Sequence, residues 1–138
     1  MSKIFTPREA DALIARIEGI FLHMDSCQKR ALELGAAVPP KTADPSDADI
    51  ATSARLRSQI EFLLLAVQED ISLISRMGGV VKDVSVGLVD FPGRVNGEDA
   101  WLCWKRGEDK IHYWHPLYAG YSDRLTLRRS QDRTGTSH

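Results

Sequence analysis

Two long segments of this sequence repeat apolar residues with the three- and four-residue spacing of a coiled-coil seam. In the first segment the apolar positions are Ala10, Leu13, Ile17, Ile20, Met24, Cys27, Ala31 and Leu34. In the second they are Leu56, Ile60, Leu63, Leu64, Val67, Ile71, Ile74 and Met77. This spacing places the apolar side chains on one face of a helix, and that face must be buried against another element. The sequence therefore predicts two long amphipathic helices that pack together.

Local signals indicate where each helix begins and ends. Thr6-Pro7-Arg8-Glu9 has the residues of a capping box with proline in the first turn, so we expect helix one at residues 6–37. Ser46 is a suitable cap for helix two and Gly78-Gly79 should stop it, which gives residues 46–78. The connection between the helices is expected to be a loop because it contains Pro39, Pro40 and Pro45.

After the glycine pair, β-branched and aromatic residues replace the helical spacing. The candidate strands are Val80-Val81, Leu88–Phe91, Ala100–Trp104 and Lys110–His115. Pro92-Gly93 should end the second strand, Asn96-Gly97 should form a two-residue type I′ turn, and Pro116 should end the last strand. The expected fold class is α+β, a long antiparallel helical hairpin followed by a small three- to four-stranded antiparallel β-meander. The meander and its C-terminal loop should span residues 80–127, followed by a disordered tail at 128–138.

The composition is that of an ordinary globular protein. The chain has 138 residues, of which 43% are hydrophobic and 27% charged, and its formal net charge is −1. This length suits a single domain, expected at residues 1–127. The near-zero charge argues against nucleic-acid binding, which needs a surplus of Lys and Arg. No apolar run approaches the roughly 20 residues that cross a bilayer, and the N-terminus lacks the apolar core of a secretory signal. We therefore expect a cytoplasmic protein without a membrane partner.

Metal binding is not expected from the predicted strand register. If Gly107-Glu108 is a two-residue turn, Cys103 pairs with His112 on one face of the sheet, and His115 points to the other face. Cys103 and His112 alone are two ligands short of a structural zinc site. A bulge would reverse this assignment, because one extra residue re-aims every later side chain. Cys27 and Cys103 have no CxxC spacing, so we interpret both as buried reduced thiols. We expect neither a metal nor another cofactor.

The stretch from Trp101 to Arg124 concentrates aromatic and titratable residues. The candidate ligand-binding residues in and beside it are Asp90, Trp104, Trp114, His115 and Arg124. Aromatic walls with Arg124 as a clamp would suit an anionic ligand, whereas the same residue types also serve packing and turn capping. The sequence has no P-loop, no GxGxxG motif and no nucleophile elbow. We therefore assign no catalytic residues and favour a protein that is not an enzyme.

Short motifs in the C-terminal third carry a resemblance to a known family. They are Gly87-Leu88-Val89-Asp90-Phe91-Pro92, Leu102-Cys103-Trp104-Lys105 with Gly107-Glu108, Trp114-His115, and Gly120-Tyr121 followed by Arg124. Together they resemble an uncharacterised bacterial family, domain of unknown function 2203, whose layout also includes long helices. The resemblance marks as motif positions Asp90, Cys103, Trp104, Glu108, Trp114, His115, Gly120 and Arg124. Pro116, Tyr118 and Asp123 depart from the residues that the family would have, and the resemblance implies no activity.

Two functional hypotheses follow from these patterns. The first is a non-enzymatic module that forms a homo-oligomer through its helices, with another protein as a possible partner. Its support is that each helix of about 30 residues would be about 45 Å long and carries a wide apolar stripe. The small sheet could instead cover the excess apolar surface. The second hypothesis is a small-molecule binding protein or enzyme with an anion pocket between the sheet and the hairpin.

Overall fold

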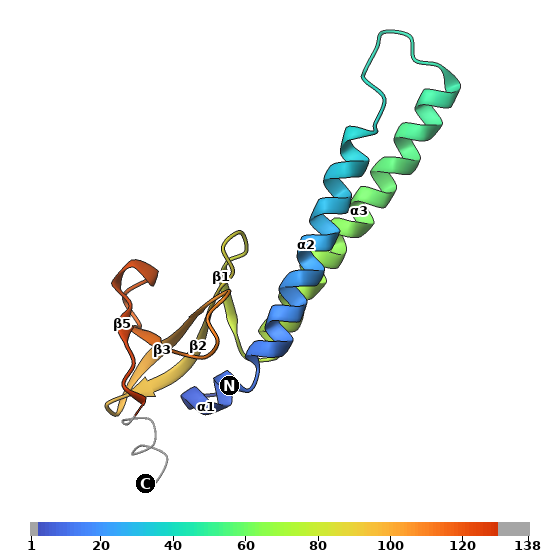
Figure 1. Ribbon diagram of the computed structural model, residues 1–138. Coiled ribbons are helices and arrows are strands. Elements are labelled where there is room, and N and C mark those ends of the chain that lie inside the picture. Colours follow the sequence, from blue (N-terminus) through green and yellow to red (C-terminus); the bar gives the residue numbers. More distant parts are fainter. Residues whose placement is uncertain (1–2, 130–138) are drawn as a thin grey trace. The chain divides into compact units, whose positions relative to one another are not determined.

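The coiled-coil spacing and the turn residues together produce an α+β fold. The computed structural model describes residues 3–129 (Figure 1). Its helices are α1 (Pro7–Asp11), α2 (Ile14–Ala36), α3 (Asp47–Arg76) and the 3-10 helix η1 (Tyr121–Asp123). Its strands are β1 (Val80–Asp83), β2 (Leu88–Val95), β3 (Glu98–Lys105), β4 (Tyr113–Pro116) and β5 (Leu125–Thr126). The expected fold class, a helical hairpin followed by an antiparallel meander, is confirmed.

The described residues divide into two compact units. The hairpin unit comprises residues 20–72, and the sheet unit comprises residues 3–19 and 73–129. None of the helices within residues 3–129 is both long enough and apolar enough to cross a lipid bilayer. Residues 130–138, which make up most of the predicted disordered tail, lie outside the described residues.

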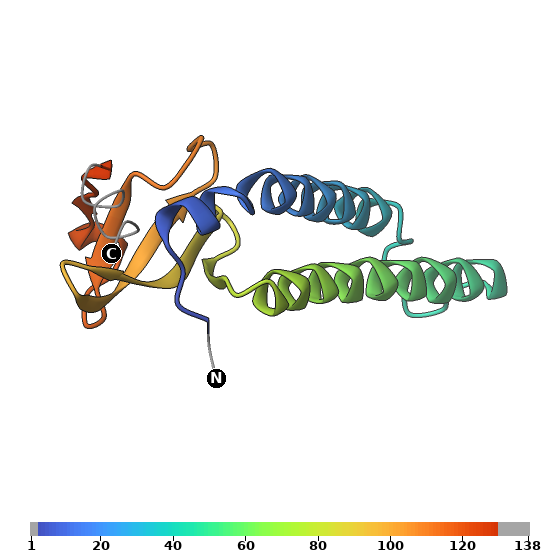
Figure 2. The same ribbon diagram turned by 90° about the horizontal axis from the view of Figure 1, so that it is seen from below.

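The hairpin unit is built from α2 and α3, which lie side by side (Figure 2). Part of the predicted seam is buried: Met24, Cys27, Ala31 and Leu34 of α2, with Leu56 and Val67 of α3. Ile60, Leu63 and Ile71 are half-buried, and Leu64, which the spacing also assigned to the seam, is exposed. A polar bond also joins the two helices, because His23 Nδ1 lies 2.5 Å from Asp70 Oδ2. The predicted cap of α3 is confirmed, since the Asp49 N–H donates to Ser46 Oγ at 3.1 Å.

The prediction of one unbroken helix over residues 6–37 is wrong. The capping box of Thr6 and Glu9 is present, but α1 ends at Asp11 and α2 begins at Ile14. At the break the Leu13 N–H bonds to the carbonyl of Ala10 at 3.0 Å instead of the carbonyl four residues back. The Asp11 carboxylate accepts a hydrogen bond from the Ile111 N–H at 2.8 Å, and the two residues are 100 positions apart in the sequence. A tertiary contact therefore accompanies the break, which local spacing does not encode.

The sheet within residues 3–129 has five strands in the order β1-β2-β3-β4-β5, and each neighbouring pair is antiparallel. The predicted meander of three or four strands gains a fifth, β5, which pairs with β4 through Trp114 and Leu125. The Asn96-Gly97 turn is confirmed. Both residues have positive φ, 55° and 80°, as a type I′ turn requires.

The prediction that Pro92-Gly93 ends the second strand is wrong, because β2 continues to Val95. The Pro92 carbonyl accepts the Phe5 N–H at 2.7 Å, and Phe5 and Gly93 form a parallel β-bridge. At Pro92 the backbone edge opposite β3 therefore faces the N-terminal segment and not a regular strand. A proline, which lacks an N–H donor, is tolerated at such an edge.

One face of the sheet forms the core of the sheet unit. This apolar face carries Val89, Phe91, Leu102, Trp104 and Trp114, which the strand register places together. All of these except Trp114 are completely buried. The Phe5 ring packs edge-on against Phe91 with 5.3 Å between ring centroids. The N-terminal segment thus helps to cover the apolar face.

Candidate functional site

The register between β3 and β4 differs by one residue from our prediction. Cys103 pairs with Tyr113, not with His112, and Trp101 pairs with His115. The connection is a loop over residues 106–112 and not a two-residue turn at Gly107-Glu108. Because a shift of one residue moves a side chain to the other face of a sheet, His115 lies on the same face as Cys103. The prediction that places His115 on the opposite face is therefore wrong.

This correction brings Asp90 of β2, Cys103 of β3 and His115 of β4 together. Asp90 pairs directly with Cys103. His115 Nε2 lies 3.0 Å from Asp90 Oδ2, and one ligand atom from each of the three residues lies within 4.8 Å of the others. The residues are 3%, 1% and 2% exposed, respectively. We call the surface that carries Asp90, Trp101, Cys103, Tyr113 and His115 the polar face of the sheet.

The second ring nitrogen of His115 is also engaged. Nδ1 lies 3.0 Å from the carbonyl oxygen of Pro116, the residue that ends β4 as predicted. A carbonyl oxygen can only accept a hydrogen bond, so Nδ1 carries the proton of this bond. The bond fixes the orientation of the ring and directs Nε2 towards Asp90.

The Cys103 thiol is chemically quiet in this environment. Burial, reinforced by the nearby Asp90 carboxylate, raises the pKa of Cys103 to about 12. Only the thiolate is a strong nucleophile, and the Cys103 side chain is 1% exposed. The arrangement therefore does not suit nucleophilic catalysis by Cys103. The Cys103 sulfur, the His115 imidazole and the Asp90 carboxylate are, however, all groups that bind metal ions.

Arg124 reaches the polar face from the residue just after η1. Its Nη1 donates towards the Cys103 sulfur at 4.0 Å, and its two terminal nitrogens bond both carboxylate oxygens of Glu108, at 3.3 and 2.9 Å. The guanidinium stacks on the rings of Tyr113 and Tyr121, 3.8 and 4.3 Å from their centroids. Burial opposes the charged form, but the bond and charge of Glu108 outweigh it and raise the pKa of Arg124. Arg124 is thus a permanent cation whose charge Glu108 already balances.

The five predicted ligand-binding residues divide between the two faces. Asp90 and His115 touch each other on the polar face, and Arg124 reaches the same cluster through Cys103. Trp104 and Trp114 lie on the apolar face. The Trp104 indole N–H donates to the Glu108 carbonyl at 2.8 Å, which satisfies its polar atom. The tryptophans therefore do not surround the polar residues.

The similarity of this chain to a known family covers nearly its whole length. A family model described as "Uncharacterized conserved protein (DUF2203)" matches residues 3–127. The chain belongs to this family. A search of curated proteins and a search of solved structures each found no match.

In this DUF2203 protein, the structure gathers most of the polar motif positions that marked the resemblance. Asp90, Cys103, Glu108, His115 and Arg124 meet through the contacts given above. Cys103 and Glu108 were absent from our predicted site, because one was interpreted as a buried thiol and the other as a turn residue. Both residues are motif positions of the family, and this is the feature of the sequence that could have placed them with Asp90, His115 and Arg124.

Proposed function

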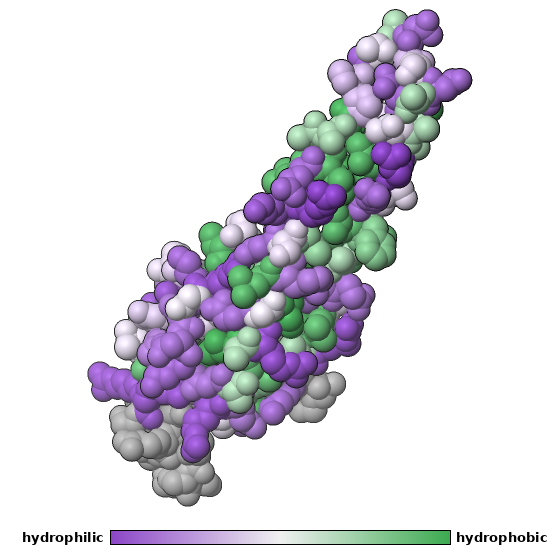
Figure 3. All heavy atoms as spheres, turned by 45° about the vertical axis from the view of Figure 1, so that its right-hand side comes forward, coloured by the Kyte–Doolittle hydropathy of each residue, from purple (hydrophilic) through white to green (hydrophobic). Residues whose placement is uncertain are grey.

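We propose that this protein is a non-enzymatic module that self-associates through its helical hairpin. One observation carries the proposal: large apolar side chains of the hairpin unit are exposed to solvent. They are Leu22, Leu32, Ile50, Phe62, Leu64 and Leu65, which range from 49% to 77% exposed. Contiguous apolar patches larger than a few hundred Å² are rare on monomeric proteins and mark contact sites. On the face of the hairpin that Figure 3 presents, apolar residues lie exposed among polar ones.

Except for Leu64, which the spacing assigned to the seam, the exposed residues lie outside the predicted seam of α2 and α3. Ile50 and Leu64 are two heptads apart, so they lie on the same side of α3, next to the seam. Phe62 and Leu65 are three residues apart and are neighbours on the outer side of α3. Two helices can bury only the stripe between them, so these side chains need a further element to cover them.

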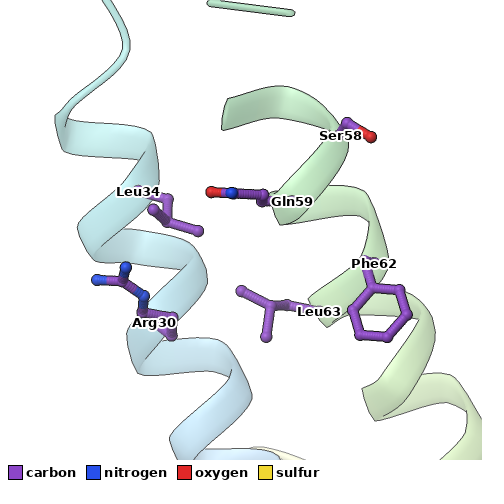
Figure 4. A pocket seen from close by; sticks show the side chains of 6 residues that line it. All are labelled: Arg30, Leu34, Ser58, Gln59, Phe62 and Leu63. Atoms are coloured by element: carbon purple, nitrogen blue, oxygen red, sulfur yellow. The ribbon is translucent and has the colours of Figure 1, made fainter. Parts of the chain in front are cut away.

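A groove between the two helices adjoins Phe62. It has a volume of about 430 Å³ and is lined by Arg30, Leu34, Ser58, Gln59, Phe62 and Leu63. In Figure 4, Leu34, Gln59 and Leu63 point into the space between the helices, whereas Phe62 lies at its outer rim. A second hairpin placed along this surface would complete a four-helix bundle, which buries the apolar positions of all four helices. The proposed occupant is therefore a second copy of this chain.

The oligomeric state in solution tests the proposal. We expect light scattering after size exclusion to give a mass of at least twice the 15.4 kDa of one chain. The double substitution Phe62→Ser with Leu65→Ser should shift the protein to the monomer, with unchanged helix content by circular dichroism. The matched control is Leu117→Ser with Tyr118→Ser, which removes exposed apolar side chains from the sheet unit.

Two results would contradict self-association through the hairpin. The first is a wild-type protein that is monomeric at micromolar concentration. The second is equal dissociation of both double variants, because the hairpin would then have no special role in assembly.

The alternative of a pocket for an anionic ligand has less support. The Glu108 carboxylate already accepts hydrogen bonds from both terminal nitrogens of Arg124. An anion would have to displace Glu108 before it could bind there. Anions and Glu108 would thus compete for the same donors. We also propose that the protein acts in the cytoplasm, where the buried thiols Cys27 and Cys103 stay reduced.

A further inference from the structure

We propose that Asp90, Cys103 and His115 bind a divalent transition-metal ion, preferentially zinc, on the polar face of the sheet. This proposal is independent of self-association, because it concerns only the sheet unit. It also departs from our sequence-based expectation of no metal site, which relied on a strand register that is wrong by one residue.

The donor atoms suit zinc in kind and spacing. One sulfur, one imidazole nitrogen and one carboxylate oxygen lie within 4.8 Å of one another. In a tetrahedral zinc site, bond lengths of about 2.0 to 2.3 Å separate neighbouring donors by about 3.5 Å. The three side chains therefore need only small movements to close on a single ion. A thiolate ligand selects zinc-like metals over magnesium and calcium, which prefer oxygen ligands.

The hydrogen bonding of His115 is that of a metal ligand. Its Nδ1 proton is committed to the Pro116 carbonyl, which leaves the Nε2 lone pair directed at Asp90 Oδ2, 3.0 Å away. An unprotonated nitrogen and an ionised carboxylate repel each other at this distance, so a proton or a cation must lie between them. Zinc-binding histidines commonly donate their other ring N–H to a carbonyl in this way.

Charge balance also favours a divalent ion. Zinc binding would release one proton from the Cys103 thiol and one from the Asp90–His115 pair, so two positive charges enter as two leave. Thiolate, carboxylate, neutral imidazole and a divalent cation then sum to zero. Neutrality matters because the three side chains are at most 3% exposed, and a net charge buried to this degree is costly.

Neighbouring residues would support the ligands without adding net charge. The Arg124 guanidinium donates towards the Cys103 sulfur, and Glu108 balances its positive charge. Donors to a coordinating sulfur stabilise its thiolate form, which a metal requires. The fourth coordination position is left for water or another small ligand, since the three protein donors do not fill a tetrahedron.

Cobalt titration of the full-length chain tests the proposal. Tag-free protein would be stripped of metal by dialysis against a chelator, and Co²⁺ would then be added in a non-thiol reductant. We expect visible bands of tetrahedral cobalt and a sulfur-to-cobalt charge-transfer band, which saturate at a single equivalent. Zinc should displace the cobalt and raise the melting temperature of the wild type.

The variants distinguish this site from other thiols. Cys103→Ser should lose the charge-transfer band, whereas Cys27→Ser should keep it. Cys27 is a matched control because it is also a buried thiol and its sulfur lies 3.7 Å from His23 Nε2. Should Cys103→Ser fail to fold, Asp90→Asn provides a second test, and it should need more Co²⁺ for saturation than the wild type.

Defined results would overturn the proposal. A wild-type protein without a cobalt spectrum and without retained zinc would mean that a shared proton alone joins Asp90 to His115. A charge-transfer band that is lost in Cys27→Ser but kept in Cys103→Ser would place the metal in the hairpin unit. An unchanged titration of Asp90→Asn would exclude this carboxylate as a ligand.

Discussion

At the scale of single residues, burial separates two ion pairs that look alike. Arg124 and Glu108 bond at 2.9 Å with side chains 15% and 18% exposed, whereas Arg94 and Asp99 bond at 3.0 Å with side chains 62% and 59% exposed. Water solvates the exposed pair in the folded and unfolded states alike, so its bond changes stability little. The Arg124 charge is largely shielded from water and depends on Glu108.

This contrast predicts different costs for two conservative substitutions. Glu108→Gln should lower the free energy of unfolding by about 2 kcal/mol, because a partly buried guanidinium loses its charged partner. Asp99→Asn, the matched control, should cost less than about 1 kcal/mol. Urea denaturation of both variants measures the difference. Equal costs would mean that Glu108 does little to stabilise Arg124.

At the scale of elements, close packing explains where β2 departs from its sequence signals. A Cβ atom at Gly93 would lie 2.7 Å from Leu102 Cγ and 3.1 Å from the Phe5 backbone oxygen. The glycine therefore lets the N-terminal segment and the next strand approach β2 together. Pro92-Gly93, which in the sequence suggests the end of a strand, instead allows a close approach of neighbouring backbone within β2.

Substitution of this glycine should be costly even though its φ is not in the left-handed region. We expect Gly93→Ala to destabilise the protein by about 1 to 3 kcal/mol through overpacking. Gly120→Ala should be nearly neutral, since no atom lies within 4 Å of the added methyl group. Thermal and urea unfolding of the two variants would test this. A stable Gly93→Ala protein would show that Leu102 and Phe5 shift without strain.

At the scale of the whole molecule, the hairpin unit is an insertion in the sequence of the sheet unit. Residues 20–72 separate the N-terminal segment from β2, with which Phe5 forms a β-bridge. The sheet unit therefore consists of two parts that lie far apart in the sequence. The proposed contact between copies is confined to the hairpin, and the proposed metal to the sheet, so the two functions can be tested separately.

Self-association predicts a stability that depends on protein concentration. The melting temperature of the wild type should rise as concentration increases, because assembly stabilises only the folded chain. The Phe62→Ser, Leu65→Ser double variant should lose this dependence, while the Leu117→Ser, Tyr118→Ser control keeps it. Scanning calorimetry over a range of concentrations measures the effect, and a constant wild-type melting temperature would contradict the oligomer.

The sequence by itself determined the long helices, the caps at Thr6 and Ser46, the Asn96-Gly97 turn and the antiparallel meander. Each of these depends on spacing or on backbone preferences within a few neighbouring residues, which a sequence displays directly. Asp90, His115 and Arg124 were also named from residue type and family resemblance. The aromatic members, Trp104 and Trp114, were assigned to the same site but lie on the other face.

Only the tertiary structure decided the break after Asp11 and the position of His115 beside Asp90 and Cys103. The break accompanies a hydrogen bond from the Ile111 N–H to the Asp11 carboxylate. The polar cluster requires the loop over residues 106–112, which shifts the pairing of β4 with β3 by one residue from the register that a two-residue turn would give. Side chains alternate between faces along a strand, so one residue in the loop that joins β3 to β4 determines whether Asp90, Cys103 and His115 meet on one face. That choice depends on long-range packing, which no local pattern records.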